Sequence, residues 1–398
     1  MSTFGGRMQE IPDVSVDNFE NENLLSTAFF LSHAHTDHMR GLNDVAFYER
    51  LLTAEKEGCT VYLYCSDITR VYLMDMKFKK GKKHLMNMGF EKIDKYIKVL
   101  PLGPSLIDVP SPENSDSRTL AVTCIPAGHC PGSVMFLFET DKFNVLYTGD
   151  FRILPEDICK FTSLRNGPSL KKIHTLYLDT TFLDTCYYYF PSRAESASTV
   201  CNRICEWLQL SPRHTVVIDL PARCGTEFIF VKIKETLGIK VHVNNETYLQ
   251  YKGIEEIHTC LTDDSRYARV HACCLRNEVQ NLSLPSWPGD DYHTRIIKPS
   301  AMWFESSGKD GKPLSVTSRG GYHCQVAHSS HASFKELADF IYTLKPNHIV
   351  PTAVPSWKSM REVQKILKEL LSNPVTLENF QEDSYSAIDS DICSNEHF

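Results

Sequence analysis

The sequence predicts an α/β protein made of one large module and an inserted α/β module. Short apolar runs that resemble strands repeatedly end in histidine or aspartate, capping-box patterns begin two long helices, and residues 214–243 resemble a strand, a helix and a strand. A βαβ unit inside a longer chain indicates an insertion, which we place at residues 160–327. We therefore expect a first module of residues 1–159 that is closed by residues 328–375.

The composition is typical of a globular protein. The 398 residues are 42% hydrophobic and 23% charged, and no apolar run approaches the ~18 residues of a membrane span. The first thirty residues carry several carboxylates in place of a signal-peptide core, so we expect no membrane association. Fourteen cysteines are mostly scattered singly, which favours a reducing compartment, cytosolic or nuclear.

Charge is distributed unevenly along the chain. The net charge is −7, and residues 377–398 hold six carboxylates without any lysine or arginine. We predict that residues 376–398 form a disordered acidic tail. Residues 77–95 instead hold seven lysines and two acidic residues. Such a run is often only a solvated surface, but beside a metal site it would follow the phosphates of a nucleic acid.

A histidine-rich loop follows the apolar run 28–31, which resembles a strand. The loop contains His33, His35, Asp37 and His38. In extended backbone the side chains of residues i and i+2 point the same way, so the first two histidines can share a metal. Three imidazoles and a carboxylate suit zinc or a similar cation. The alternative is a surface loop that is rich in histidine by chance.

Further ligand-type residues lie where other predicted strands end. Asp17 ends a short alternating strand and is a candidate to orient a ligand. His129 lies in a Gly/Pro loop that restricts its position, and Asp150 follows a buried strand and a glycine. Asp179 and His328 follow two later strands in the same manner. These strand ends predict one site, with Asp150 as the carboxylate that bridges it.

The ordered motifs resemble those of a known fold. Asp17, the segment 33–38, His129 and Asp150 match in order the four motifs of the metallo-β-lactamase fold. The Asp179 and His328 segments resemble motifs A and B of the β-CASP insertion. The chain resembles Artemis and its relatives among the DNA cross-link-repair nucleases. The resemblance implies a metallo-β-lactamase αββα sandwich with an inserted α/β β-CASP domain.

This resemblance also implies a mechanism, which is metal-assisted hydrolysis of phosphodiesters. The first metal, zinc, would be held by His33, His35, His129 and Asp150, and a second divalent metal, Zn or Mg, by Asp37, His38 and Asp150. The carboxylate of Asp179 would complete the hydrogen bonds around the metals and water. We expect His328 to act as the general acid or to contact a phosphate. As a lone residue, His328 would be a structural histidine.

Several residues are candidates to contact the substrate. Hydroxyls at Thr181, Ser329 and Ser330 could bind a 5′-phosphate, although capping of turns and helices is the alternative. The predicted contacts to the DNA backbone are Lys79, Lys80, Lys82, Lys83 and Lys298. For the last of these, the alternative is a core strand with one exposed lysine.

The resemblance implies a nuclear, metal-dependent DNA nuclease, a 5′-3′ exonuclease and/or a hairpin or overhang endonuclease. It would act on DNA ends and on single-stranded or hairpin DNA in non-homologous end joining or interstrand cross-link repair, with a DNA-end-binding kinase and end-joining factors as partners. RNA-processing endonuclease, noncatalytic scaffold subunit and small-molecule hydrolase are the alternatives. RNA-cleaving relatives carry a histidine where this chain has Thr352-Ala353-Val354, which favours DNA.

A structural zinc site in the insertion is a separate expectation. Three residues, His242, His271 and Cys273, match three ligands of the zinc site in Artemis. No cysteine lies in residues 275–292, where the fourth ligand should fall. Either another residue substitutes or the site is absent. The candidate substitutes are Cys274, Asp290, Asp291 and His293.

Overall fold

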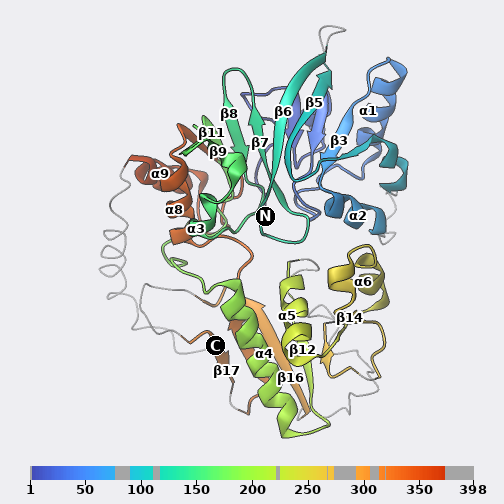
Figure 1. Ribbon diagram of the computed structural model, residues 1–398, viewed down its shortest axis with the longest axis vertical. Coiled ribbons are helices and arrows are strands. Elements are labelled where there is room, and N and C mark those ends of the chain that lie inside the picture. The colour runs from blue at the N-terminus through green and yellow to red at the C-terminus, as the bar shows by residue number, and fades with distance from the viewer. Residues whose placement is uncertain are drawn as a thin grey trace.

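Figure 1 shows the computed structural model, in which one module lies above the other in the view. The structure describes residues 2–76, 90–110, 117–220, 225–266, 268–272, 293–304, 313–318 and 320–372. Several predicted features lie outside these residues. They are the acidic tail, the lysines at 79, 80, 82 and 83, and residues 273, 274, 290 and 291 of the predicted zinc site.

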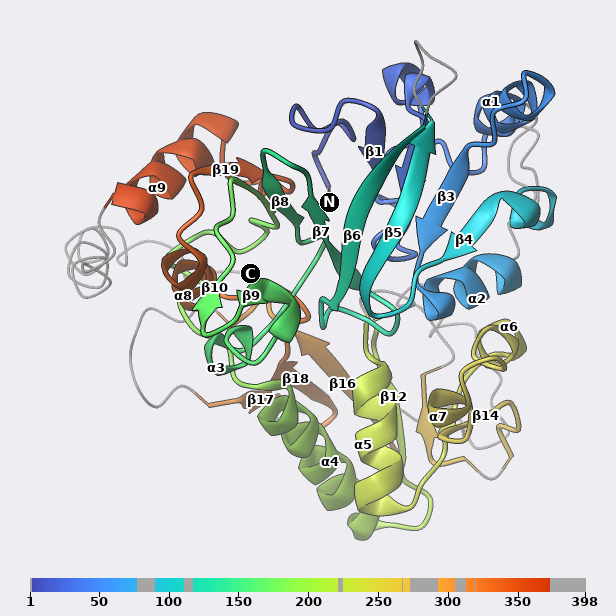
Figure 2. The same ribbon diagram turned by 45° about the horizontal axis from the view of Figure 1, so that its top comes forward.

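Two sheets form the centre of the upper module. The first is parallel, with the order β1 (Val14–Val16), β2 (Ala28–Phe30), β3 (Tyr62–Cys65), β4 (Ile97–Val99). The second is mixed and has the order β19 (His348–Pro351), β11 (Thr175–Leu178), β8 (Asn144–Tyr147), β7 (Val134–Glu139), β6 (Ser117–Pro126), β5 (Gly103–Pro110). Figure 2 shows the two sheets and the helices outside them.

Successive side chains of a strand point either into the core between the two sheets or toward the helices outside them. Phe30 packs with Phe136 in the core between the sheets, whereas Phe29 points the other way and packs on Phe47 of α1. The first sheet is covered by α1 (Val45–Lys56) and α2 (Asp67–Asp75), and the second by α8 (Phe334–Leu344) and α9 (Met360–Ser372). The predicted αββα sandwich is therefore confirmed.

The lower module is built on a largely parallel sheet. Its order is β14 (Leu261–Thr262), β13 (Val241–His242), β15 (Val270–His271), β12 (Thr215–Ile218), β16 (Thr294–Ser300), β18 (His323–Ala327), β17 (Ser315–Thr317). The helices α4 (Arg193–Leu210) and α5 (Glu227–Leu237) pack on it through Ile204 and Ile233. Shorter elements are α3 (Pro155–Ile158), α6 (Asn245–Gln250), α7 (Glu255–His258), β9 (Arg165–Asn166) and β10 (Ser169–Leu170). Four 3-10 helices are Asn21–Leu25, Phe90–Lys92, Asp94–Tyr96 and Thr162–Leu164.

One strand differs from the predicted domain division. β11 lies after residue 160, yet it pairs in parallel with β8 and with β19 of the upper module. All four of its residues are buried, so both faces of the strand are covered and it occupies an interior place in the sheet. The predicted start of the insertion at residue 160 is therefore too early.

Strand direction brings the predicted strand ends together. β8, β11 and β19 are parallel, so their carboxyl ends meet at one edge of the second sheet. β1 and β2 are parallel in the first sheet, and the candidate residues follow both of them. Among the described residues, no helix combines the length and the apolar character that a membrane crossing requires.

Candidate metal centre

Three histidines and one aspartate converge where the two sheets end. His33 Nε2 and His129 Nε2 each lie 3.1 Å from His35 Nδ1, and each lies 3.7 Å from Asp150 Oδ2. Zinc ligands at ~2.0–2.1 Å in a tetrahedron are roughly 3.3 Å apart, so this spacing fits a tetrahedral cation. These four residues form a group that could hold a metal.

Hydrogen bonds fix which histidine nitrogens face the centre. The carbonyl of Ser330 lies 3.1 Å from His129 Nδ1 and can only accept, so the ring donates there and a neutral ring has its lone pair on Nε2. Burial, followed by the charge of nearby histidines, holds the pKa of His33 and of His129 well below the ordinary value. Neutral rings that point lone pairs at one another are suited to a cation between them.

A buried carboxylate lies behind the histidine loop. Asp17 accepts hydrogen bonds from the Ser32 backbone and hydroxyl at 2.7 and 2.6 Å and from Tyr147 Oη at 2.9 Å, and lies 2.8 Å from His38 Nδ1. It is 1% exposed and has a φ of +56°, a conformation that Asp and Asn tolerate better than most residues. These contacts hold Asp17 against the loop, and its role in orienting a metal ligand remains a prediction.

Replacing Asp17 by asparagine tests this orienting role, because asparagine keeps the shape and tolerates the same φ. We expect the Asp17→Asn variant to bind metal about 10- to 100-fold more weakly, since its amide cannot accept all the hydrogen bonds that the carboxylate accepts. Competition with a chelator measures the affinity. Asp13→Asn is the control, because Asp13 forms its ion pair with Arg118 away from the centre. Equal metal affinity in all three proteins would contradict this role.

A second group lies on the other side of Asp150. His38 Nε2 is 3.2 Å from Asp150 Oδ1 and 3.8 Å from Asp37 Oδ2, and the latter oxygen accepts a hydrogen bond from the Ser2 backbone at 2.8 Å. Burial acts to lower the pKa of His38, but the charges of Asp150 and Asp17 outweigh it and raise the pKa well above the ordinary value. The predicted ligands of the second metal therefore lie near one another, beside Asp150, and the bridging role of Asp150 remains a prediction.

His331 joins this centre, and the sequence analysis missed it. Its Nδ1 lies 2.8 Å from Asp179 Oδ2, its Nε2 lies 3.9 Å from Asp150 Oδ2, and its ring packs on that of His129. Asp150, Asp179 and His331 form a further group that could hold a metal. Burial acts to lower the pKa of His331, but the two carboxylates outweigh it and raise the pKa. The capping box that begins α8 at Ser333 was the available signal, since it places His331 just before a helix.

The structure does not bring His328 to the centre, which corrects the predicted catalytic role. Its imidazole is buried next to the backbone of Gly225, and it belongs to none of the groups of described residues that could hold a metal. Burial, followed by the charges of Arg193 and Arg152, lowers the pKa of His328 to about 4. A ring with this pKa is neutral at pH 7, so it is not the imidazolium that a general acid of this kind requires. His331 is better placed for that role.

The three predicted phosphate-binding hydroxyls differ in their surroundings. Thr181 Oγ1 donates to Asp179 Oδ1 at 2.6 Å, and Ser329 Oγ donates to the carbonyl of His331 at 2.7 Å. These two hydroxyls thus stabilise turns at the site. Capping of turns is the alternative to phosphate binding that the sequence analysis gave. Within the described part of the chain, the hydroxyl of Ser330 makes no such bond.

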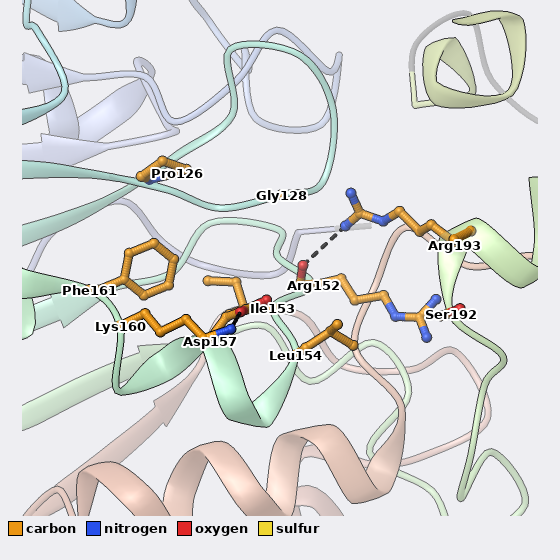
Figure 3. A pocket seen from close by; sticks show the side chains of 11 residues that line it. Pro126, Gly128, Arg152, Ile153, Leu154, Asp157, Lys160, Phe161, Ser192 and Arg193 are labelled. Atoms are coloured by element: carbon orange, nitrogen blue, oxygen red, sulfur yellow. Dashed lines mark hydrogen bonds and ion pairs between the residues drawn. The ribbon is translucent and has the colours of Figure 1, made fainter. Parts of the chain in front are cut away.

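Arg152 fastens the segment that carries Asp150. Its guanidinium is buried and donates to the Glu336 carboxylate at 3.0–3.2 Å and to the carbonyls of Ser329 and Pro191 at 2.9 Å. Figure 3 shows Arg193 reaching across to the carbonyl of Arg152, a bond of 3.0 Å. Both arginines line a cavity of about 490 Å³ that contains none of the candidate metal ligands. Arg152 and Arg193 therefore stabilise the backbone next to Asp150 and do not belong to the candidate ligands.

Known proteins share this arrangement of motifs. Residues 255–356 match a family model described as DNA repair metallo-beta-lactamase, and residues 17–169 match one described as Anti-Pycsar protein Apyc1. The chain is 37% identical to the protein Artemis of Gallus gallus over 93% of its own length and 50% of that protein. With Artemis of Homo sapiens it shares 37% identity over 93% of its length and 52% of that protein. The chain is an Artemis-like metallo-β-lactamase/β-CASP protein.

A more distant relative supports the same assignment. The Artemis-like chain is 31% identical to DNA cross-link repair 1A protein of Homo sapiens, over 86% of its own length and 30% of that protein. It spans about half the length of the Artemis proteins that it matches. The recognition made from the motifs is confirmed.

The β-CASP insertion of this Artemis-like chain contains the predicted histidine pair. His242 and His271 are register partners on β13 and β15, and their Nδ1 atoms are 3.1 Å apart. His271 Nε2 is buried without a hydrogen-bond partner among the described residues. His293 lies against His214, so it is not shown beside this pair. A structural zinc here remains a prediction.

The predicted DNA-contacting lysine in the described residues is Lys298. It is half-buried on β16, beside Gln325 of β18. Trp303 and Phe304 pack in a small core with Phe182, as expected for core aromatic residues. Contact of Lys298 with DNA remains a prediction.

Proposed function

We propose that this Artemis-like chain is a metal-dependent DNA nuclease that hydrolyses phosphodiester bonds. The observation that carries the proposal is the convergence of His33, His35 and His129 on Asp150, at a spacing that fits a tetrahedral cation. The β-CASP insertion supports a nucleic-acid substrate over a small thioester or lactam. Names of the relatives, Artemis and DNA cross-link repair 1A, support DNA over RNA.

The proposal gives each group of residues a role. The histidine group with Asp150 holds a first metal, and Asp37, His38 and Asp150 hold a second. When bound, such a metal pair supplies a hydroxide nucleophile and neutralises charge on the phosphate. His331, held by Asp179 at 2.8 Å, gives a proton to the leaving 3′-oxygen. The carboxylate of Asp179 keeps the Nδ1 proton in place, so Nε2 is the nitrogen that faces the substrate.

A cleavage assay with the purified chain and added Mg²⁺ or Zn²⁺ tests the proposal. Substrates are 5′-phosphorylated and 5′-hydroxyl single strands, DNA hairpins, and RNA of matched sequence. We expect DNA to be cut, and Asp37→Asn to be slower by at least about 100-fold, because it removes a charged ligand. Asp44→Asn is the matched control, since the Asp44 side chain makes no capping bond to α1.

The products separate the two kinds of nuclease. A 5′-3′ exonuclease requires the 5′-phosphate and releases nucleotides in order. A hairpin-opening endonuclease cuts substrates with a 5′-phosphate and with a 5′-hydroxyl equally well. Cleavage of RNA alone would replace the proposal with an RNA-processing enzyme. Bound metal without cleavage of any substrate would favour a noncatalytic scaffold.

The same proposal also covers the identity of the two metals, the location of the protein in the cell and its partners. We assign zinc to the first site because three imidazoles suit it, and Zn²⁺ or Mg²⁺ to the second, which has more oxygen ligands. Elemental analysis of protein purified without chelators identifies the first metal. A nuclear location, repair of DNA ends, and contact with a DNA-end-binding kinase and end-joining factors follow from the likeness to Artemis. Imaging of a tagged chain tests the location.

A further inference from the structure

A second cavity of about 520 Å³ lies between the two modules and reaches the metal centre. His129 and Ile68 contribute to it from the upper module, and Phe228, Val231, Ile254 and Ile257 from the insertion. Figures 1 and 2 both show the loop between β6 and β7 above the N-terminal end of α5. A candidate metal ligand and a largely apolar chamber therefore share one space.

Phe228 is the unusual residue of this cavity. This residue is 43% exposed, whereas Ile229, Phe230 and Ile233 of the same helix are at most 1% exposed. Those three residues pack in the core of the insertion, and the ring of Phe228 is left to face the cavity. An exposed aromatic ring in an apolar chamber offers a flat surface on which another ring can stack.

The charges around the cavity favour the base of a nucleotide over its phosphate. The carboxylate of Glu227 is occupied, because it accepts hydrogen bonds from the Gly225 backbone at 2.7 Å and from Tyr251 Oη at 2.6 Å. Lys232 pairs with Glu235 at 3.4 Å, and Glu256 adds another carboxylate to the lining. Carboxylates repel a phosphodiester, so the α5 and α7 side of the cavity favours a neutral, flat group. The guanidinium of Arg193 lies on the other side, beside Gly128, where its charge suits the adjoining phosphate.

We propose that this cavity receives the nucleobase next to the phosphate at the metal centre, stacked on Phe228. This inference rests on the proposed nuclease function and adds a binding site for one base. A base held there is turned out of the strand, which fixes the adjoining phosphate at His129. The site requires a single strand or an unpaired end, because a paired base cannot leave its stack without cost.

Substrates with one abasic position test the inference. A set of 5′-phosphorylated strands, each lacking one base, is cut by the wild-type protein, by Phe228→Ala and by Phe228→Tyr. In the wild type we expect one abasic position to lower kcat/KM by about 10-fold, as the loss of a stacked base does. Phe228→Ala is expected to be slower on intact DNA and insensitive to that position. Phe228→Tyr keeps a ring and is expected to keep the sensitivity to that abasic position.

Tyr342→Ala is the matched control, because Tyr342 is 46% exposed on α8 and lies outside the cavity. It should retain both the wild-type rate and the wild-type abasic profile. If the wild type cuts intact DNA but Phe228→Ala keeps the same abasic profile, the base site is refuted and the nuclease function stands. If the wild type cuts none of the strands, both are refuted.

Discussion

Asp150→Asn is expected to lower DNA cleavage by about 10³-fold or more and to reduce the metal content of the protein. Asp150 Oδ2 lies 3.7 Å from both His33 and His129, and Oδ1 lies 3.2 Å from His38, so one carboxylate serves both groups. Burial acts to raise the pKa of Asp150, but His38 and His331 outweigh it and hold the pKa well below the ordinary value. The amide of asparagine has no charge to give to either metal, and metals supply several kcal/mol of barrier lowering.

Elemental analysis and single-turnover cleavage measure these two effects separately. Asp141→Asn is the matched control. This substitution removes the same charge, and Asp141 is exposed at the opposite end of β8. It should keep both the metal and the rate. If Asp150→Asn kept its metal content and cut DNA at a normal rate, the bridging role of Asp150 would be wrong.

Arg152→Met is expected to destabilise the fold by about 3–5 kcal/mol, because it leaves a buried carboxylate without its partner. Arg152 and Glu336 are each about 10% exposed or less in their side chains, and the guanidinium also satisfies carbonyls of Ser329 and Pro191. Water cannot replace these bonds at a buried site without a cost. The bonds join the Asp150 segment to α8, so the variant should also bind metal more weakly.

Calorimetry of the metal-free protein measures the loss of stability without a contribution from ligand binding. Lys335→Met is the matched control, since Lys335 pairs with Asp339 at 2.8 Å on the exposed side of α8. An exposed pair of this kind contributes less than about 1 kcal/mol. A similar melting temperature for both variants would show that the Arg152 pair does not hold the two segments together.

Local signals made much of the fold predictable. The capping boxes at Ser192 and Ser333 begin α4 and α8 where the sequence placed them. Continuous apolar runs identified strands such as β2 and β7, because a strand that is buried on both faces is apolar at successive positions. The pairing of β11 with β8 and β19 depends on contacts across the chain, so the start of the insertion could not be predicted.

The same distinction applies to the candidate site. His33, His35 and His38 were found because they lie within six residues of one another, directly after a strand. His331 was missed in favour of His328, three residues earlier, because a turn between β18 and α8 decides which ring faces Asp179. No periodic pattern describes such a turn. The four donors around Asp17 likewise come from contacts up to 130 positions away.

The order of the chain has a consequence for biosynthesis. The upper module is left open after β11, and it is closed only by His331, α8 and β19, when the whole insertion has been made. On the ribosome, the first 180 residues emerge with β11 lacking its neighbour β19 and Asp179 lacking its histidine. The sheet of the upper module can therefore be completed only after the insertion has been synthesised. The ligands from His33 to Asp150 are made before the insertion, whereas the contact between Asp179 and His331 can form only after it, so the centre is assembled in two stages of synthesis.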